Sequence, residues 1–488
     1  MTSHPVVQSH VTDIDGVAWG WRWASNQPNG HTQLTYGFPD ATWSYDYWIG
    51  GFQPFNPAQQ AAGHRAVAEF DKVCNLDFVF AGTGFANIRM AEADWINVGY
   101  GYGDYPIGSA FGWAPDPNFS PPAAQGDTWF NHTTYNNPVP GSHAFASGLL
   151  HEIGHAVGLK HTDQTQEVED AYGTYLYTNP ALAFDRDSIE FTVMSYRSFP
   201  GAKDDIVYAI EFPTTLMQND IAALQYLYGA NFAHHAGNTV YSFNPTTGEM
   251  FVDGQGQGAT LNGKIFLTIW DGGGIDTLNF ANYTTNAVID LNPGAWSTPS
   301  AAQRADLDIE HPGTHFARGC IANALLPGGD ARGMIENAIG GEGHDTITGN
   351  AASNALAGGG GGDTISGGDG ADVLIGGGGK DYLSGNAGGD YFVFTSAAES
   401  RKGMFNHDAI LDFSRAEGDQ ISLSLLDAKE KKGGLQHFKF IGGKQFHDKA
   451  GELRCSKHLL QGDTDGNGKA DFEVWVNVKV GAGDLILA

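Results

Sequence analysis

The chain has few cysteines and few basic residues. Its three cysteines, Cys74, Cys320 and Cys455, lie far apart and form no CxxC pair, which excludes a disulfide framework. Buried free thiols are expected, with a single bridge between two of them left open. Only 26 residues are Lys or Arg against 55 Asp or Glu, giving a net charge of −29. Such a surface repels phosphate backbones and anionic lipid, which argues against nucleic-acid binding and suits a protein that collects divalent cations.

Long apolar runs are also missing. Residues 1–16 contain none, so we expect no N-terminal secretory signal peptide. No stretch of eighteen apolar residues occurs, so we expect no membrane-spanning helix. Hydrophobic residues still make up 41% of the 488 residues, which indicates a globular protein of several domains.

Residues 17–233 mix helical and strand patterns. We expect strands at residues 34–38, 87–91 and 127–131, and helices at residues 57–73, 145–159 and 219–228. This mixture predicts a small α/β (α+β) domain. A short polar linker at residues 234–239 follows, and residues 240–488 are expected to form an all-β domain.

One short segment has the spacing of metal ligands. His151 and His155 are four residues apart, so a helix would present both to one ion, with Glu152 beside them to polarise a water. Gly158 can adopt positive φ, end the helix and bring His161 round as a third ligand. Three protein ligands with an open fourth position are what a catalytic zinc requires. The alternative, a helix with three surface histidines, leaves this spacing unexplained.

A nine-residue period starts at Gly340 and repeats six times, to residue 393. Its pattern, Gly-Gly-x-Gly-x-Asp-x-U-x with U a large apolar residue, is typical of a parallel β-roll that binds calcium between neighbouring turns. A flexible glycine-rich linker would not keep the apolar residues in phase. The expected calcium ligands are Gly341, Gly343, Asp345, Gly359, Gly361, Asp363, Gly368, Gly370, Asp372, Gly377, Gly379, Asp381 and Asp390.

Two departures from the calcium pattern carry their own expectations. The second repeat, residues 349–357, has Asn354 in place of the aspartate, so its calcium site should be weak or missing. Further on, Asp463, Asp465 and Asn467 match the start of an EF-hand loop, but the twelfth position is Val474 rather than Glu. A β-hairpin turn is the favoured interpretation there, with calcium binding as the alternative.

Residues 193–196 are Val-Met-Ser-Tyr. A His motif of this kind followed by such a turn is the metzincin signature, and the chain from about residue 34 onward resembles the serralysins. The resemblance implies that Met194 forms an apolar floor below the zinc. It also implies that Tyr196 binds zinc and moves away to stabilise the transition state. Residues 270–277 and 335–340 resemble the family's first calcium loop and the start of its repeats, which implies calcium binding by Asp271, Gly273, Gly274, Asp276 and Glu336.

This resemblance implies a secreted zinc endopeptidase that hydrolyses proteins or peptides. Residues 17–233 would be the metzincin catalytic domain, residues 240–488 the RTX β-roll with a C-terminal signal for type I secretion, and residues 1–16 a short propeptide. A monomer is expected, and a proteinaceous inhibitor is a further candidate partner. The chain departs from the family in its three cysteines, in Thr162 where the family usually has proline, and in residues 163–187, which align poorly.

The expected mechanism uses a zinc-activated water. Glu152 would take its proton and pass it to the leaving amine, and Tyr196 would donate a hydrogen bond to the oxyanion. A calcium-dependent adhesion or surface-layer protein with an inactive protease domain is the competing class, although no ligand is missing. A lipase would need a GxSxG elbow between a strand and a helix, and the sequence has none.

Overall fold

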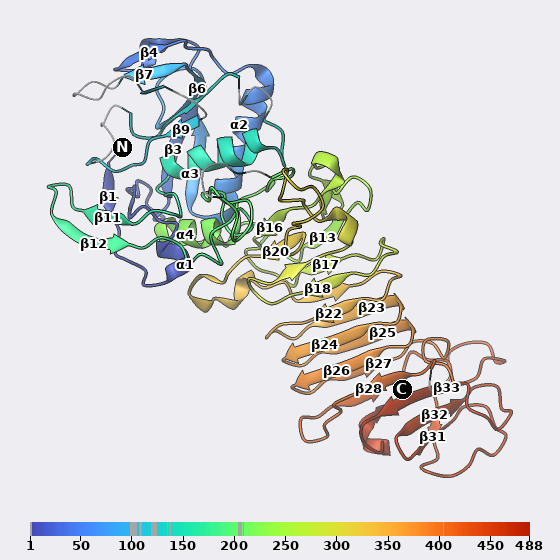
Figure 1. The fold of residues 1–488 in the computed structure, drawn as a ribbon. Coiled ribbons are helices and arrows are strands. Elements are labelled where there is room, and N and C mark those ends of the chain that lie inside the picture. The colour runs from blue at the N-terminus through green and yellow to red at the C-terminus, as the bar shows by residue number, and fades with distance from the viewer. Residues whose placement is uncertain are drawn as a thin grey trace. The chain divides into compact units, whose positions relative to one another are not determined.

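A computed structural model describes most of the chain, namely residues 2–97, 105–106, 110–118, 124–133, 135, 138–203, 207, 209–403 and 405–488. The chain divides into two compact units, whose elements are labelled in Figure 1. The first unit comprises Met1–Ala236, Ala259–Gly272 and Arg304–Gly333, and the second Gly237–Gly258, Gly273–Gln303 and Met334–Ala488.

This division differs from the single boundary expected at residues 234–239. Two later segments belong to the first unit because they pair with each other and with it. Strand β16 (Leu267–Ile269) lies parallel to β20 (Ile321–Asn323), and the amide of Thr214 donates to the carbonyl of Phe266 at 2.9 Å. The chain therefore leaves the first unit and returns to it twice.

A five-stranded mixed sheet forms the centre of the first unit, in the order β5-β3-β6-β10-β9. Only the edge strand β9 is antiparallel to its neighbour. The bounds are β3 Thr32–Gly37, β5 Leu76–Phe80, β6 Ile88–Glu92, β9 Ala110–Gly112 and β10 Asp127–Phe130. Helix α2 (Pro57–Val73) lies beside this sheet in Figure 1 and buries Ala66 and Phe70.

Helix α2 begins and ends where the sequence predicts. Asn56 caps it by accepting from the amides of Ala58 and Gln59, while Gln59 accepts from the amide of Asn56. Pro57 occupies the first turn, where no amide hydrogen is needed. The other α-helices are α1 (Thr12–Asp15), α3 (His151–Ala156) and α4 (Gln218–Tyr228).

The helix expected at residues 145–159 is wrong in its form. Residues Ala144–Leu150 (η2) are π-helical, α3 begins at His151 and ends at Ala156, and the chain turns at Gly158. Hydrophobic spacing cannot separate α from π winding, because both bury one face of the segment.

Smaller sheets and turns complete the first unit. Residues 163–187, which align poorly with the family, contain a hairpin of β11 (Gln166–Glu169) and β12 (Tyr175–Asn179). The remaining elements are β1 Ser3–Pro5 paired with β2 Trp21–Trp23, the sheet of β4 Trp48–Gly50, β7 Trp95–Asn97 and β8 Tyr105–Pro106, and the short turns η1 Thr42–Ser44, η3 Leu261–Gly263, η5 Pro327–Gly329 and η6 Ala331–Gly333.

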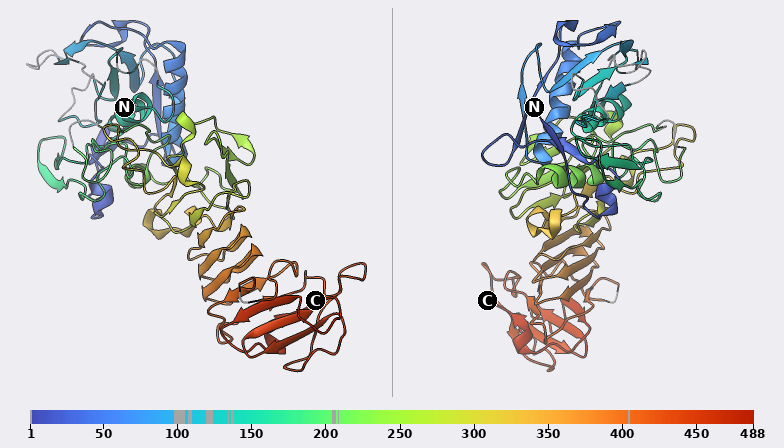
Figure 2. Two further views of the ribbon diagram at one scale, coloured as in Figure 1. Left: turned by 45° about the vertical axis from the view of Figure 1, so that its right-hand side comes forward. Right: turned by 90° about the vertical axis from the view of Figure 1, so that its left-hand side faces the viewer.

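The second unit is built from two sheets whose strands alternate along the chain. Successive parallel strands of one sheet are 18 residues apart: Ile347 pairs with Ile365, which pairs with Leu383, and in the other sheet Leu356 pairs with Leu374. Both views of Figure 2 show these strands as successive rungs. Two nonapeptides thus make one full turn, which is the geometry of a β-roll.

Strands of this unit fall into the two sheets as follows. The first holds β15 Gln255–Gly256, β14 Met250–Val252, β13 Val240–Phe243, β17 Thr277–Asn279, β21 Asn337–Ile339, β23 Ala355–Gly361, β25 Val373–Gly379, β27 Tyr391–Val393, β29 Gln420–Ser422 and β34 Leu485–Ile486. The second holds β18 Val288–Asp290, β22 Thr346–Thr348, β24 Thr364–Asp369, β26 Tyr382–Ala387, β28 Asp408–Ile410, β33 Phe472–Val476, β32 Leu459–Asp463, β31 Glu452–Ser456 and β30 Lys439–Phe440. Outside them are β19 Trp296–Ser297, η4 Ala301–Gln303 and η7 Ala482–Asp484.

Apolar residues at the eighth position of each repeat form the core between the sheets. Each is at most 1% exposed: Ile347, Leu356, Ile365, Leu374, Leu383 and Phe392. Cys74, Cys320 and Cys455 are buried, as expected, and none of the three forms a disulfide. Among the helices of the described ranges, none has the length and apolarity needed to cross a bilayer.

Truncating one core residue should destabilise the second unit. Leu374→Ala removes a fully buried side chain, and large-to-small core substitutions cost about 2–5 kcal/mol. A lower urea midpoint of the calcium-loaded protein, followed by far-UV circular dichroism, is the expected result. Leu425→Ala, at a 58% exposed position, is the matched control and should change little. Equal midpoints for the two variants would contradict a core at this position.

Candidate metal centres

Three imidazole rings converge in the first unit. The Nε2 atom of His161 lies 2.9 Å from that of His155 and 3.2 Å from that of His151. The hydroxyl of Tyr196 lies 2.8 Å from the same His161 atom. Helix α3 carries His151 and His155, and the turn after it delivers His161. The structure thus brings together all four residues that the sequence predicts around zinc.

The outer nitrogens of two rings are held by backbone carbonyls. His151 Nδ1 lies 2.7 Å from the Val193 oxygen, and His155 Nδ1 lies 2.9 Å from the Leu159 oxygen. A carbonyl only accepts, so Nδ1 carries the proton and Nε2 presents a lone pair to the centre. Burial, together with the neighbouring imidazoles, lowers the pKa of each of the two rings to about 3.

His161 is also neutral at physiological pH. Burial and the nearby His151 ring lower its pKa to about 3. Each neutral imidazole has one nitrogen lone pair that it can offer to a cation. Imidazole nitrogens in a set of three are a typical catalytic zinc donor set. The residues present therefore fit zinc.

The turn that positions His161 rests on residues 17–23. The amide of Lys160 donates to the Val17 carbonyl, and the amide of Trp19 donates to the Gly158 carbonyl, both at 2.8 Å. Gly158 has φ +103°, and a Cβ there would collide with the carbonyl oxygen of Trp21. Only glycine fits this close approach at positive φ, as its place in the motif predicts.

Met194 packs directly against helix α3, which carries His151 and His155. It is fully buried, and a Cβ added at Gly154 would lie 2.8 Å from its sulfur. Its turn is held by Asp220 of α4, which accepts from the amides of Val193 and Met217, each at 2.9 Å. No motif predicts Asp220. The acidic residue in the first turn of the expected helix at residues 219–228 was the available signal.

Glu152 is buried beside the histidines. The amide of Gly112, on edge strand β9, donates a hydrogen bond to its carboxylate. Burial nevertheless raises the pKa of Glu152 well above its usual range. A carboxylate with a raised pKa is a stronger base, as a group that accepts and returns a proton in catalysis must be.

In the second unit, aspartates form two hydrogen-bonded ladders. Along one sheet, the amides of Asp345, Asp363 and Asp381 each donate to the aspartate 18 or 27 residues later, at 2.8–2.9 Å. Along the other, the amides of Asn354, Asp372 and Asp390 each donate to the aspartate 18 or 29 residues later, at 2.8–3.0 Å. The ladders end on Asp408 and Asp419, which the nonapeptide period does not predict. Their local sequences, Asp408-Ala-Ile410 and Asp419-Gln-Ile421, repeat the Asp-x-U signal after an insertion.

The second carboxylate oxygens of these ladders point at other oxygens. Within the described part of the chain, Oδ2 has no hydrogen-bond partner in Asp363, Asp372, Asp381 or Asp390. At Gly358 and Gly367, an added Cβ would meet both the repeat's own aspartate Oδ2 and the carbonyl oxygen of the glycine 18 residues on. Oxygens that face each other without a donor call for a hard cation, and calcium prefers oxygen ligands.

The predicted glycines divide by conformation. Positive φ is found at Gly359, Gly361, Gly368, Gly370, Gly377 and Gly379, but not at Gly341 or Gly343. The side-chain Nδ2 of Asn354 donates to the Glu336 backbone carbonyl at 2.7 Å and to Asn350 Oδ1 at 3.0 Å. Asn354 therefore supplies a hydrogen-bond donor where calcium needs acceptor oxygens. The weak or missing calcium site in the second repeat stays a prediction, and these Asn354 contacts favour it.

The remaining calcium candidates are partly assembled. Glu336 accepts from the amide of Asp276 at 2.8 Å, and Gly273 and Gly274 adopt positive φ. Asp271 belongs to the first unit. At the end of the chain, β32 and β33 confirm the hairpin turn, which gathers the carboxylates of Asp463, Asp465 and Asp471.

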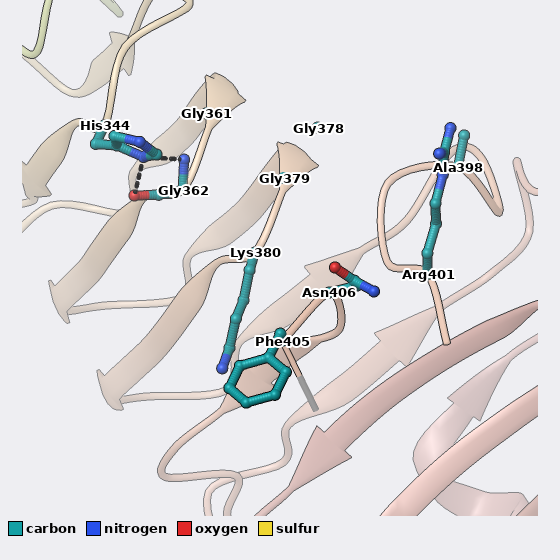
Figure 3. A pocket seen from close by; sticks show the side chains of 10 residues that line it. All are labelled: His344, Gly361, Gly362, Gly378, Gly379, Lys380, Ala398, Arg401, Phe405 and Asn406. Carbon is teal, nitrogen blue, oxygen red and sulfur yellow. Dashed lines mark hydrogen bonds between the residues drawn. The ribbon is translucent and has the colours of Figure 1, made fainter. Parts of the chain in front are cut away.

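A separate hollow of about 820 Å³ lies on the second unit. Its lining includes Lys380, Arg401 and Phe405. Figure 3 shows the cationic ends of Lys380 and Arg401 directed away from each other. The hollow therefore presents no convergent set of groups to a single anion.

Comparison with known proteins identifies the family. Residues 230–303 and 329–486 match the family described as Peptidase M10 serralysin C terminal. Serralysin from Photorhabdus laumondii subsp. laumondii is 36% identical over 86% of this chain and 76% of its own length. Metalloprotease AprA from Pseudomonas entomophila is 33% identical over 97% of this chain and 88% of its own. The chain belongs to the serralysin family.

Without calcium, the second unit should be more stable in mild acid than at neutral pH. Burial raises the pKa of Asp363 to about 7 and of Asp372 and Asp381 to about 6, above the unfolded value of about 3.9. The folded state then binds more protons between about pH 4 and pH 7, so its unfolding free energy falls as pH rises.

Circular dichroism in excess chelator, from about pH 4.5 to pH 8, measures this dependence. Calcium should abolish it by stabilising the ionised ladders. Asp363→Asn should weaken it, because one carboxyl group no longer titrates. A calcium-free unit that gains structure as pH rises would contradict the placement of these carboxyls.

Proposed function

We propose that this protein is a secreted zinc endopeptidase. The observation that carries the proposal is the convergence of the Nε2 atoms of three neutral imidazole rings, from His151, His155 and His161, beside the buried Glu152. Tyr196 reaches the same point. The serralysins and the metalloprotease that the chain resembles support a hydrolytic role for this geometry.

In this proposal, the first unit is a metzincin-type catalytic domain and the second is a calcium-dependent β-roll. In the first unit, strand β9 is the edge of the central sheet and lies next to Glu152. An exposed edge can pair with an extended peptide by main-chain hydrogen bonds, which would bring a scissile bond to the metal. The substrates would accordingly be proteins or peptides in extended conformation.

Each residue of the site has a role in peptide hydrolysis. Zinc held by the three histidines would supply Lewis acidity to the scissile carbonyl and to a water molecule. Glu152 accepts the proton of the attacking water and returns it to the leaving amine. Burial raises the pKa of Tyr196, so its hydroxyl stays protonated and can donate to the oxyanion.

In this proposal, folding of the β-roll would require calcium and would follow export. Buried acceptor oxygens disfavour the fold when calcium is scarce, so the unit would stay unfolded in a cell and fold outside it. Type I secretion by a C-terminal signal agrees with this order of events.

A proteinaceous inhibitor would act at the catalytic unit. Residues 1–16, proposed as a propeptide, contribute β1 and α1 to the first unit.

Replacing Glu152 should abolish hydrolysis and leave zinc binding intact. Glu152→Gln keeps the size of the side chain but removes the proton acceptor, so kcat/KM on casein should fall about 10²–10⁴-fold. Glu167→Gln, on the exposed hairpin, is the matched control and should keep full activity. Both proteins are assayed with calcium and one equivalent of zinc.

Two results would contradict this proposal. A Glu152→Gln protein with wild-type activity would show that Glu152 is not the catalytic base. An inactive wild-type protein with zinc bound and the β-roll folded would instead favour an adhesion or surface-layer role.

A further inference from the structure

We propose that Asp187 is a positioning residue that fixes His161, the third zinc ligand, and Tyr196 relative to each other. This inference rests on the proposed zinc peptidase function and deepens it. Asp187 touches neither the metal nor the substrate. It acts through the residues next to His161 and Tyr196.

Three side chains donate to the Asp187 carboxylate. The hydroxyls of Thr162 and Ser195 reach Oδ1 at 2.5 Å and 2.6 Å. The Nε of Arg197 reaches Oδ2 at 3.1 Å. Thr162 follows His161 directly, and the other two donors flank Tyr196. One carboxylate thus joins the segment that carries a ligand to the segment that carries the tyrosine.

These bonds are shielded from water. Thr162 and Ser195 are 1% exposed and Asp187 is 5% exposed. Hydrogen bonds to a charged group are stronger than neutral ones, and losing one in the interior leaves a buried group unsatisfied. The arrangement is therefore stiff, and small shifts of either segment would break it.

His161 needs such support because it lies beyond the end of α3. Helical backbone bonds fix His151 and His155, but the third ligand sits in the loop that follows. On its other side, the buried ammonium of Lys160 donates to the carbonyls of Gly16 at 2.8 Å and His161 at 3.2 Å. Charged anchors thus hold the chain immediately before and after this histidine. Only the one formed by Asp187 also reaches the tyrosine segment.

Single substitutions separate the two connections. Thr162→Val is nearly isosteric and removes only the hydroxyl, so the zinc dissociation constant should rise about 10–100-fold. Thr162→Ser keeps the hydroxyl and should restore wild-type affinity. Ser195→Ala should lower kcat of the zinc-loaded enzyme about tenfold, with KM and zinc affinity unchanged. Asp187→Ala should show both effects, because it removes the oxygen that accepts from both hydroxyls.

Competition with a chromogenic chelator measures zinc affinity, and casein hydrolysis at saturating zinc measures kcat. Thermal unfolding is recorded in parallel, and the two hydroxyl variants keep the test open if Asp187→Ala fails to fold. Lower thermal stability with unchanged zinc affinity and kcat would overturn the proposal and leave Asp187 a structural residue. Zinc binding without any hydrolysis by the wild type would contradict the peptidase function instead. The zinc affinities of Thr162→Val and Thr162→Ser would still test whether Asp187 positions His161.

Discussion

The first unit depends on three neutral imidazole rings whose Nε2 atoms face one another in a largely buried space. Carbonyls of Val193 and Leu159 fix the tautomers of His151 and His155, so the inward nitrogens have no proton to share. Such a set of rings can hold one cation as a three-nitrogen site. The surrounding structure keeps these groups in place.

Several segments distant in sequence supply that restraint. Residues 17–23 support the turn at Gly158, and Asp220 of α4 fixes the turn that carries Met194. Carboxylates in the second unit are comparable, since their ladders leave buried Oδ2 atoms without a hydrogen-bond donor. In both units, therefore, the fold gathers groups of the kind that bind a metal ion.

Much of this is predictable because the signals are local. Helix α2 is capped within its own sequence, and the histidine motif sets its geometry by helical spacing. What escapes prediction is non-local. The pairing of β16 with β20 returns two late segments to the first unit, and Asp187 meets a threonine 25 residues earlier. The π-helical start before His151 escapes because α and π windings share one apolar pattern.

Zinc-edge X-ray absorption on the calcium-loaded protein tests the central claim most directly, because it reports the atoms around the metal. We expect one tightly bound zinc per chain, with three imidazole nitrogens at about 2.0–2.1 Å and one or two oxygens from water or Tyr196. A His161→Ala protein should lose one nitrogen from this shell. A wild-type spectrum dominated by carboxylate oxygens, or a shell unchanged by that substitution, would contradict the account.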